Sequence, residues 1–220
     1  MNLYIIVIAY GLLYYAYTNT LNNCKIVKTV DNVDLDRFIE HTWYPQYQQE
    51  VKYQTRDSFY CVSATYNLEP DRKVPLFSGK VISVYNYANY DKVNGVPMNT
   101  RNGTVLCAKQ PDAYDNSKLV VSPCNVPSVF GGPYWIIGLQ QNYEWAVISG
   151  GQPENQYSDG CTTNVNTSNN SGLWIFSRYP IMPKEHLDDA RSLLNDKGYT
   201  LSKLLPVEQE GCLYKDAFIK

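Results

Sequence analysis

"DLDRFIEHTWYPQYQQE" (residues 34–50) is the stretch that decides how the fold begins. It consists of a short helical lead, then Thr42-Trp43-Tyr44, and then a polar run with the character of a strand. A Trp at the entrance of a strand belongs to the core, stacks on a ligand, or plugs one end of the structure. The rest of the chain distinguishes these three roles.

Short strands account for most of the remaining sequence. Each is a run of aromatic or β-branched residues bounded by turn residues. Gly150 to Ser171, rich in Asn, Ser, Thr and Gly, is expected to be a long loop between the last two strands. With the strand after Trp43, eight strands are predicted, and the other seven cover residues 59–68, 79–87, 103–109, 118–124, 134–139, 143–149 and 173–178.

One amphipathic helix follows the eighth strand. Leu187, Ala190 and Leu194 recur at helical spacing, Pro183 stands at the start, and Gly198 stands where a helix would end. A last short strand is expected over residues 203–208. Eight antiparallel strands followed by one helix predict an all-β, up-and-down barrel with the helix packed on its outside, because closure removes exposed strand edges.

The composition favours one globular domain and excludes a nucleic-acid footprint. The chain has 220 residues, and its 19 Lys and Arg nearly balance its 21 Asp and Glu. The 20 Tyr suit half-buried strand faces and ligand pockets, although a β-rich composition alone accounts for them equally well.

The N-terminus predicts secretion. Residues 1–20 have the apolar core of a signal peptide, which leaves residues 21–220 as the domain. A retained membrane anchor is the alternative, but the run is short and no basic residue flanks it before Lys25, so no stable membrane insertion is expected. The six cysteines include no CxxC pair and indicate disulfides rather than a metal site. Glycosylation motifs at Asn102, Asn166 and Asn169 fit an extracellular chain.

Four segments resemble the lipocalin family, with the pattern of its apolipoprotein D, bilin-binding and bacterial group. They are "VDLDRFIEHTWYPQY", "CVSATYNL", "GPYWIIGLQQNYEWAVIS" and "LWIFSRYPIMPKEHLDDARSLLNDKGYTLSKLLPVEQEGC", and they occur in the family's order over most of the chain. The resemblance implies an eight-stranded calyx around a ligand cavity. The third segment lacks the Asp of the family's Thr-Asp-Tyr turn, so no receptor is implied.

The same resemblance gives Trp43 a structural role. The family's first strand begins with Gly-x-Trp, and that Trp packs under an Arg near the end of the last barrel strand, which matches Trp43 and Arg178 here. A cation over an aromatic face stabilises such a plug. The family's Gly is replaced in Glu40-His41-Thr42-Trp43, so the corner between helix and strand is expected to differ. His41 and His186 are expected at the surface.

Two disulfide pairs are implied by the resemblance and the third by position. The family group pairs the cysteines that match Cys24–Cys161 and Cys61–Cys212. Cys107 and Cys124 are left, and the turn-like "DAYDNSK" midway between them would place them on neighbouring strands. Six cysteines allow 15 pairings, so this choice is a hypothesis.

Strand alternation and the resemblance together suggest the ligand-lining residues. Trp174 and Tyr66 match positions that line the pocket of apolipoprotein D. Phe176 shares the face of Trp174 and Arg178, and Tyr47 shares the face of Trp43. Tyr47, Tyr66, Trp174 and Phe176 are therefore expected to line an apolar cavity that takes a flat hydrophobic ligand. The alternative is that these aromatics fill the barrel.

The leading functional hypothesis is a secreted carrier of a small hydrophobic ligand such as a lipid, sterol, retinoid, carotenoid or tetrapyrrole. A lipocalin-type enzyme is one alternative, but every cysteine has an expected disulfide partner and no GxSxG, HExxH or P-loop motif occurs, so no catalytic residue, metal or cofactor is expected. A secreted protein-interaction module that uses the loop over residues 150–171 is the other alternative.

Overall fold

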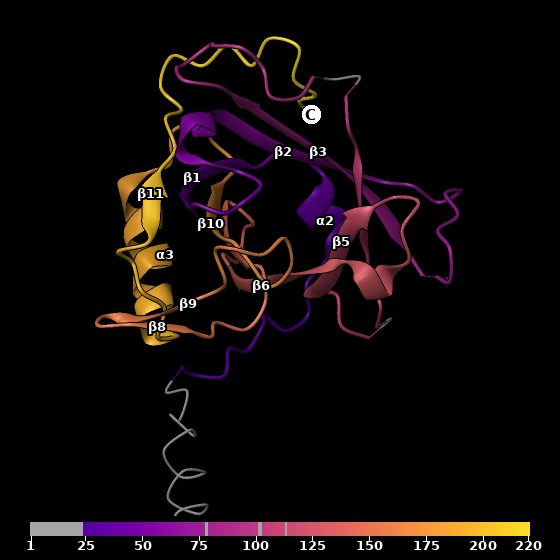
Figure 1. Cartoon of the computed structure of the whole chain (residues 1–220), viewed down its shortest axis with the longest axis horizontal. Helices are drawn as coiled ribbons and strands as arrows, with labels where there is room; N and C mark the ends of the chain where they lie inside the picture. The colour runs from indigo at the N-terminus through magenta and orange to yellow at the C-terminus, as the bar shows by residue number, and fades with distance from the viewer. Residues whose placement is uncertain (1–23, 78, 101–102, 113) are drawn as a thin grey trace, which may run out of the picture.

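A curled antiparallel sheet of nine strands dominates the computed structural model, which describes residues 24–77, 79–100, 103–112 and 114–220 (Figure 1). The expected signal peptide and Asn102 lie outside these residues. The strands of the sheet are β1 (Tyr44–Gln49), β2 (Tyr60–Leu68), β3 (Val81–Asn89), β4 (Leu106–Lys109), β5 (Lys118–Pro123), β6 (Gly132–Leu139), β7 (Trp145–Ser149), β10 (Leu173–Ser177) and β11 (Leu204–Pro206). Two α-helices, α2 (Leu35–Ile39) and α3 (Lys184–Asp196), and two 3₁₀ turns, η1 (Arg56–Ser58) and η2 (Ser128–Phe130), complete this part of the fold.

The strand order gives an up-and-down barrel. Strands β2 to β7 each pair with their neighbour in the chain, and β10 pairs with both β7 and β1. The sheet therefore curls until β1 and β2 meet, where Trp43 and Ala64 exchange two backbone hydrogen bonds of 2.9 Å. The predicted eight-stranded antiparallel barrel with an outer helix is confirmed, and β11 is an extra strand on the outer edge of β1.

Residues 207–209, here called the seam segment, complete the junction between β1 and β2. The amide of Val207 donates to the Gln46 carbonyl of β1 (2.9 Å), and Glu208 bonds to the chain at the start of β2. The buried side chain of Gln209 donates from Nε2 to Pro45 on β1 (2.7 Å) and to Val62 on β2 (2.8 Å). Because one amide bonds both strands, it holds the barrel shut where direct strand pairing is sparse.

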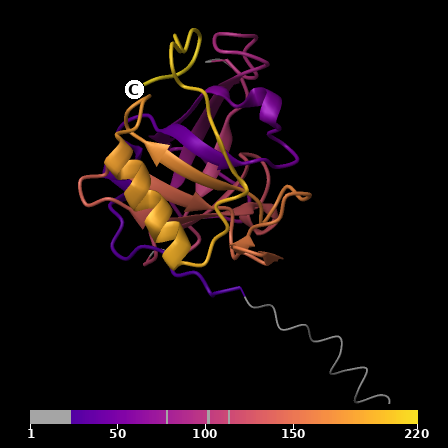
Figure 2. The ribbon, with the colours of Figure 1, turned by 90° about the vertical axis from the view of Figure 1, so that its left-hand side faces the viewer.

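Where helix α3 covers the barrel, both faces of the wall are apolar, for different reasons. Inward side chains such as Ile136, Ile148 and Phe176 form the interior cluster with Trp43. Outward neighbours such as Ile137 and Val147 pack under helix α3, which lies along the outside of the barrel (Figure 2). Strands covered on both faces have no polar side, and this explains their nearly continuous hydrophobic sequence.

The helix ends follow from individual residues. The Asp34 carboxylate accepts hydrogen bonds from the amides of Asp36 and Arg37, which caps helix α2. Helix α3 begins after Pro183 and ends before Gly198, whose φ of +79° lies in the left-handed region that favours glycine.

The segment between β7 and β10 contains structure that the sequence analysis did not predict. Strands β8 (Asn155–Tyr157) and β9 (Gly160–Thr162) pair as a separate hairpin. The disulfide between Cys24 and Cys161 ties this hairpin to the N-terminal segment. The expected loop over residues 150–171 is therefore partly a pinned hairpin, and only its second half is free to border the barrel opening.

Candidate ligand-binding site

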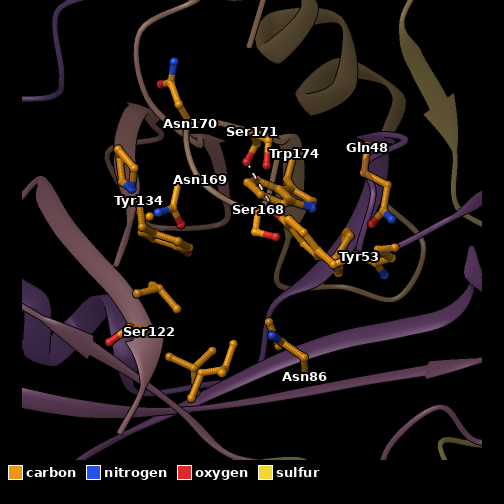
Figure 3. Close-up of a pocket in the computed structure, with 18 of the residues that line it drawn as sticks. Gln48, Tyr53, Asn86, Ser122, Tyr134, Ser168, Asn169, Asn170, Ser171 and Trp174 are labelled. Carbon is orange, nitrogen blue, oxygen red and sulfur yellow. Dashed lines mark hydrogen bonds between the residues drawn. The ribbon is translucent and has the colours of Figure 1, made fainter. Parts of the chain in front are cut away.

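The barrel contains a partly open cavity of about 310 Å³ with a largely apolar lining. This volume is at the lower end of the range of small-molecule sites. The walls come from the inner faces of β1 to β6 and β10, and one end is bordered by η2 and residues 168–171 (Figure 3). The apolar side chains of the lining are Pro45, Val62, Ala64, Val84, Leu106, Val121, Pro123, Phe130, Pro133, Tyr134, Trp174 and Phe176.

Polar groups in the lining are uncharged. They come from Gln48, Tyr53, Gln54, Ser63, Asn86, Ser122, Ser168, Asn169, Asn170 and Ser171. Within the described part of the chain, no Asp, Glu, Lys, Arg or His lines the cavity. The described residues of the lining therefore offer a ligand hydrogen-bonding groups but no ion-pair partner.

Two of the four expected ligand residues border the cavity, since Trp174 and Phe176 on β10 face it. Tyr66 lies on the inner face of β2 but deeper, in the floor. It is 2% exposed, its ring centroid lies 6.0 Å from that of Phe38, and its hydroxyl is 2.8 Å from that of Tyr134. Tyr134 borders the cavity, so Tyr66 supports the lining from behind.

The inward assignment of Tyr47 is wrong. The pairing of β1 with β10 shifts register between Pro45 and Tyr47, which places a bulge at Gln46. A bulge adds one residue and reverses the alternation beyond it. The side chain of Tyr47 therefore points outward and joins the cluster under helix α3, where its ring centroid lies 4.6 Å from the guanidinium carbon of Arg191. Gln48 takes the inward position instead.

The closed end of the barrel is organised around Trp43 and Arg178. The Trp43 ring is fully buried, and the guanidinium carbon of Arg178 lies 3.6 Å from its centroid. Arg178 also donates to the backbone carbonyls of Arg37 (3.0 Å), Phe38 (3.0 Å), Tyr143 (3.1 Å) and His41. A cation beside the carbonyls at a helix C-terminus is favourable, so Arg178 fastens helix α2 over the barrel end. This is the plug arrangement that the resemblance implied.

Burial perturbs the ionisable groups of this floor. Desolvation lowers the pKa of Arg178 to about 10, so the guanidinium stays charged at neutral pH. Desolvation also raises the pKa of the Tyr66 and Tyr134 hydroxyls, and the hydrogen bond between the two lowers the first and raises the second. Both hydroxyls are therefore neutral hydrogen-bonding groups at any physiological pH.

The C-terminal residues also seal this end, which the sequence analysis missed. The Lys220 ammonium donates to the Ile39 carbonyl at the end of helix α2 (2.8 Å) and to the Tyr66 carbonyl (2.7 Å). Thr42 bonds to Lys220 through its side chain and its amide. Nothing in the sequence pattern of this segment indicates a long-range contact.

The remaining predicted features occupy separate regions. The disulfides join Cys24 to Cys161, Cys61 to Cys212 and Cys107 to Cys124, the pairs given by the sequence hypothesis. Asn166 is exposed, and Asn169 is exposed beside the cavity. His41 is exposed as expected, but the expectation for His186 is wrong, because its side chain is 13% exposed and lies 3.5 Å from the Glu144 carboxylate.

The helices formed by the described residues are all too short or too polar to cross a membrane.

Comparison with known proteins gives a family and a fold. Residues 33–209 match the model of the lipocalin-like domain. A protein of Acanthamoeba polyphaga mimivirus that is described as a lipocalin is 24% identical over 188 residues, which cover 81% of this chain and 86% of the relative.

Two solved structures have similar folds. Lobster apocrustacyanin A1 is 14% identical with a TM-score of 0.53, over 90% of this chain and 98% of that one. Insecticyanin from the tobacco hornworm Manduca sexta is 16% identical with a TM-score of 0.53, over 84% of this chain and 85% of that one. Since the domain model spans most of the chain and the barrel has the same architecture, this protein belongs to the lipocalin family.

Proposed function

We propose that the protein is a secreted carrier that binds a small hydrophobic ligand inside the barrel. The observation that carries the proposal is the cavity of about 310 Å³ inside the barrel, whose lining is mainly apolar and includes Tyr134, Trp174 and Phe176. Aromatic walls with a few uncharged polar groups suit a mostly apolar molecule. Membership of the lipocalin family supports the same role.

The cysteines support carriage over cysteine-based catalysis. All six form disulfides, so no thiol is available as a nucleophile. Disulfides also form and persist mainly in oxidising compartments, which supports secretion. We include in the proposal that residues 1–20 are removed as a signal peptide and that Asn102, Asn166 and Asn169 accept glycans. N-terminal sequencing and glycosidase digestion of the protein secreted by a eukaryotic host test these two points.

A binding measurement with an uncharged probe tests the carrier role. N-phenyl-1-naphthylamine fluoresces on entering an apolar site, and wild-type protein is expected to bind it at one site per chain. Trp174→Ala is expected to weaken binding about two- to tenfold, because ring contacts between aromatics contribute about 0.5–1.5 kcal/mol beyond area burial.

Tyr47→Ala is the matched control for this measurement. It removes an aromatic ring from β1, which pairs with β10, but that ring points outward under helix α3. Its probe affinity is expected to equal that of wild type. A wild-type protein that binds no apolar probe would contradict the carrier role and favour a protein-interaction module.

A further inference from the structure

Gln48 is a completely buried polar side chain that faces the cavity (Figure 3). Strand pairing places it beside Trp174 of β10. Among the residues that the structure describes, neither its Nε2 nor its Oε1 has a hydrogen-bond partner. The next residue differs: Gln49 points outward, donates to the Thr163 carbonyl (3.1 Å) and accepts from the Thr162 hydroxyl (2.6 Å). The protein thus satisfies the outward amide of this pair and leaves the inward one unpaired at the wall of the cavity.

A second unpaired polar group belongs to the same cavity lining. The Ser171 hydroxyl is in the lining, its residue is 4% exposed, and in the described structure its Oγ has no partner. Ser171 precedes β10 by two residues, and its carbonyl accepts a hydrogen bond from the Tyr53 hydroxyl (3.3 Å), drawn as a dashed line in Figure 3. By contrast, the Tyr134 hydroxyl in the lining is paired with Tyr66. The unpaired hydrogen-bonding groups of the lining therefore belong to β1 and to the residues that lead into its neighbour β10.

The chemistry of these groups restricts the ligand. A carboxamide offers two donor hydrogens and an acceptor oxygen, and a hydroxyl both donates and accepts. Leaving such groups buried without partners is costly, so a ligand that pairs with them gains affinity. An ionised carboxylate would gain donors, but no cationic side chain of the described residues lines the cavity to offset its desolvation.

We propose that the cavity selects an uncharged, mostly apolar molecule with one polar group, a hydroxyl or a carboxamide, that hydrogen bonds to Gln48 and Ser171. This inference rests on the proposed carrier function and specifies its ligand class. The group accepts from the Gln48 Nε2, donates to its Oε1, and shares a hydrogen bond with the Ser171 hydroxyl. The apolar body then lies against Trp174 and Phe176.

Matched ligands of one chain length test the selection. Dodecanol and dodecanoate are titrated at neutral pH against protein loaded with N-phenyl-1-naphthylamine. Wild-type protein is expected to bind dodecanol at least about tenfold more tightly than dodecanoate, which corresponds to one or two net hydrogen bonds and an unpaired charge. Gln48→Leu, of similar volume, is expected to weaken dodecanol binding about tenfold and to leave the affinity for the probe itself within about twofold.

Gln156→Leu is the matched control, because Gln156 is an exposed residue of the separate hairpin strand β8 and does not border the cavity. Its dodecanol affinity is expected to stay within about twofold of wild type, since the same substitution there leaves the cavity lining unchanged. If wild type binds the probe but prefers dodecanoate or shows no preference, the ligand class is wrong and the carrier role stands. An unchanged dodecanol affinity in a folded Gln48→Leu protein likewise refutes the role of Gln48. If wild type binds neither probe nor dodecanol, the carrier role itself fails.

Discussion

Removing the disulfide between Cys61 and Cys212 is expected to destabilise the protein more than removing either of the other two. Cys61 lies in β2, and Cys212 follows the seam segment by three residues. This bridge therefore anchors the segment that joins β1 to β2. The perturbation is the double variant C61A/C212A, compared with C107A/C124A and with C24A/C161A.

The lengths of the loops that the bridges close account for the first part of the expected difference in the free energy of unfolding. The bridges close loops of 151, 137 and 17 residues for Cys61–Cys212, Cys24–Cys161 and Cys107–Cys124. The chain-entropy relation gives about 5.1, about 5.0 and about 3.1 kcal/mol respectively. Loop length alone therefore separates the short bridge from the two long ones and leaves the long ones equal.

The position of the seam segment accounts for the second part of this difference in the free energy of unfolding. Without Cys61–Cys212, the seam segment is free to leave, and the two hydrogen bonds of the Gln209 amide are lost at about 0.5–1.5 kcal/mol each. The free energy of unfolding is expected to fall most for C61A/C212A, less for C24A/C161A, and least for C107A/C124A. C24A/C161A is the control for loop length, because it breaks a long loop and leaves the seam segment in place.

Urea denaturation of the non-reduced proteins gives the free energies of unfolding. Hydrogen exchange of the Val207 and Glu208 amides, which bond to the carbonyls of Gln46 and Phe59, reports on the seam segment directly. Faster exchange at these amides in C61A/C212A alone supports the reasoning. A C107A/C124A protein that loses as much stability as C61A/C212A would refute it, and so would equal seam exchange in all three variants.

Three further outcomes are expected from the floor and the wall of the barrel. Arg178→Ala is expected to lower the free energy of unfolding by about 2–4 kcal/mol, because several backbone carbonyls and the buried Trp43 ring lose their cationic partner. Arg178→Lys is expected to recover only part of this loss. The urea midpoints of the two variants test both expectations. Because the pKa of Tyr66 and Tyr134 is raised in the folded state, their contribution to stability is complete below about pH 10 and is lost as the pH rises further. The loss of stability with rising pH, followed by circular dichroism, is therefore expected to be shallower in Tyr66→Phe than in wild type. An identical pH profile would contradict this. Gly138→Ala is expected to lower the free energy of unfolding by about 1–3 kcal/mol, because the added methyl group would lie 3.0 Å from the Leu193 side chain of helix α3. A thermal midpoint equal to that of wild type would contradict this and show that the helix adjusts freely.

The barrel can be predicted from the sequence because the evidence for it lies in local patterns. Alternation along β10 places Trp174 and Phe176 inward, and the end signals at Pro183 and Gly198 delimit helix α3, without reference to distant residues. The same local rule fails at Tyr47, because a bulge is a property of the pairing between β1 and β10. The one extra residue of the bulge turns Tyr47 outward and Gln48 inward, so the cavity wall carries a carboxamide where an aromatic ring was expected.

The features that the sequence analysis missed depend on contacts between distant residues. Lys220 bonds to Ile39 and Tyr66, and Gln209 joins β1 to β2, but neither belongs to a periodic or capping motif. The β8–β9 hairpin lies in a stretch of turn-forming residues, where weak strand propensity hides the short strands. Tyr134 faces the cavity by simple alternation with Ile136 on β6, so this lining residue was within reach of the sequence pattern.

The seam segment also bears on the order in which the protein is able to fold. It comes after every strand of the barrel in the chain, yet it holds together β1 and β2, the first two strands. During synthesis, the facing edges of β1 and β2 stay incompletely paired until residues 207–209 have been added. Contacts between segments this distant form slowly, because loop closure precedes any gain from pairing, and open strand edges favour aggregation meanwhile. An early Cys61–Cys212 bond would hold the late segment beside these edges, so the rate of oxidation at this pair would govern the yield of closed barrels.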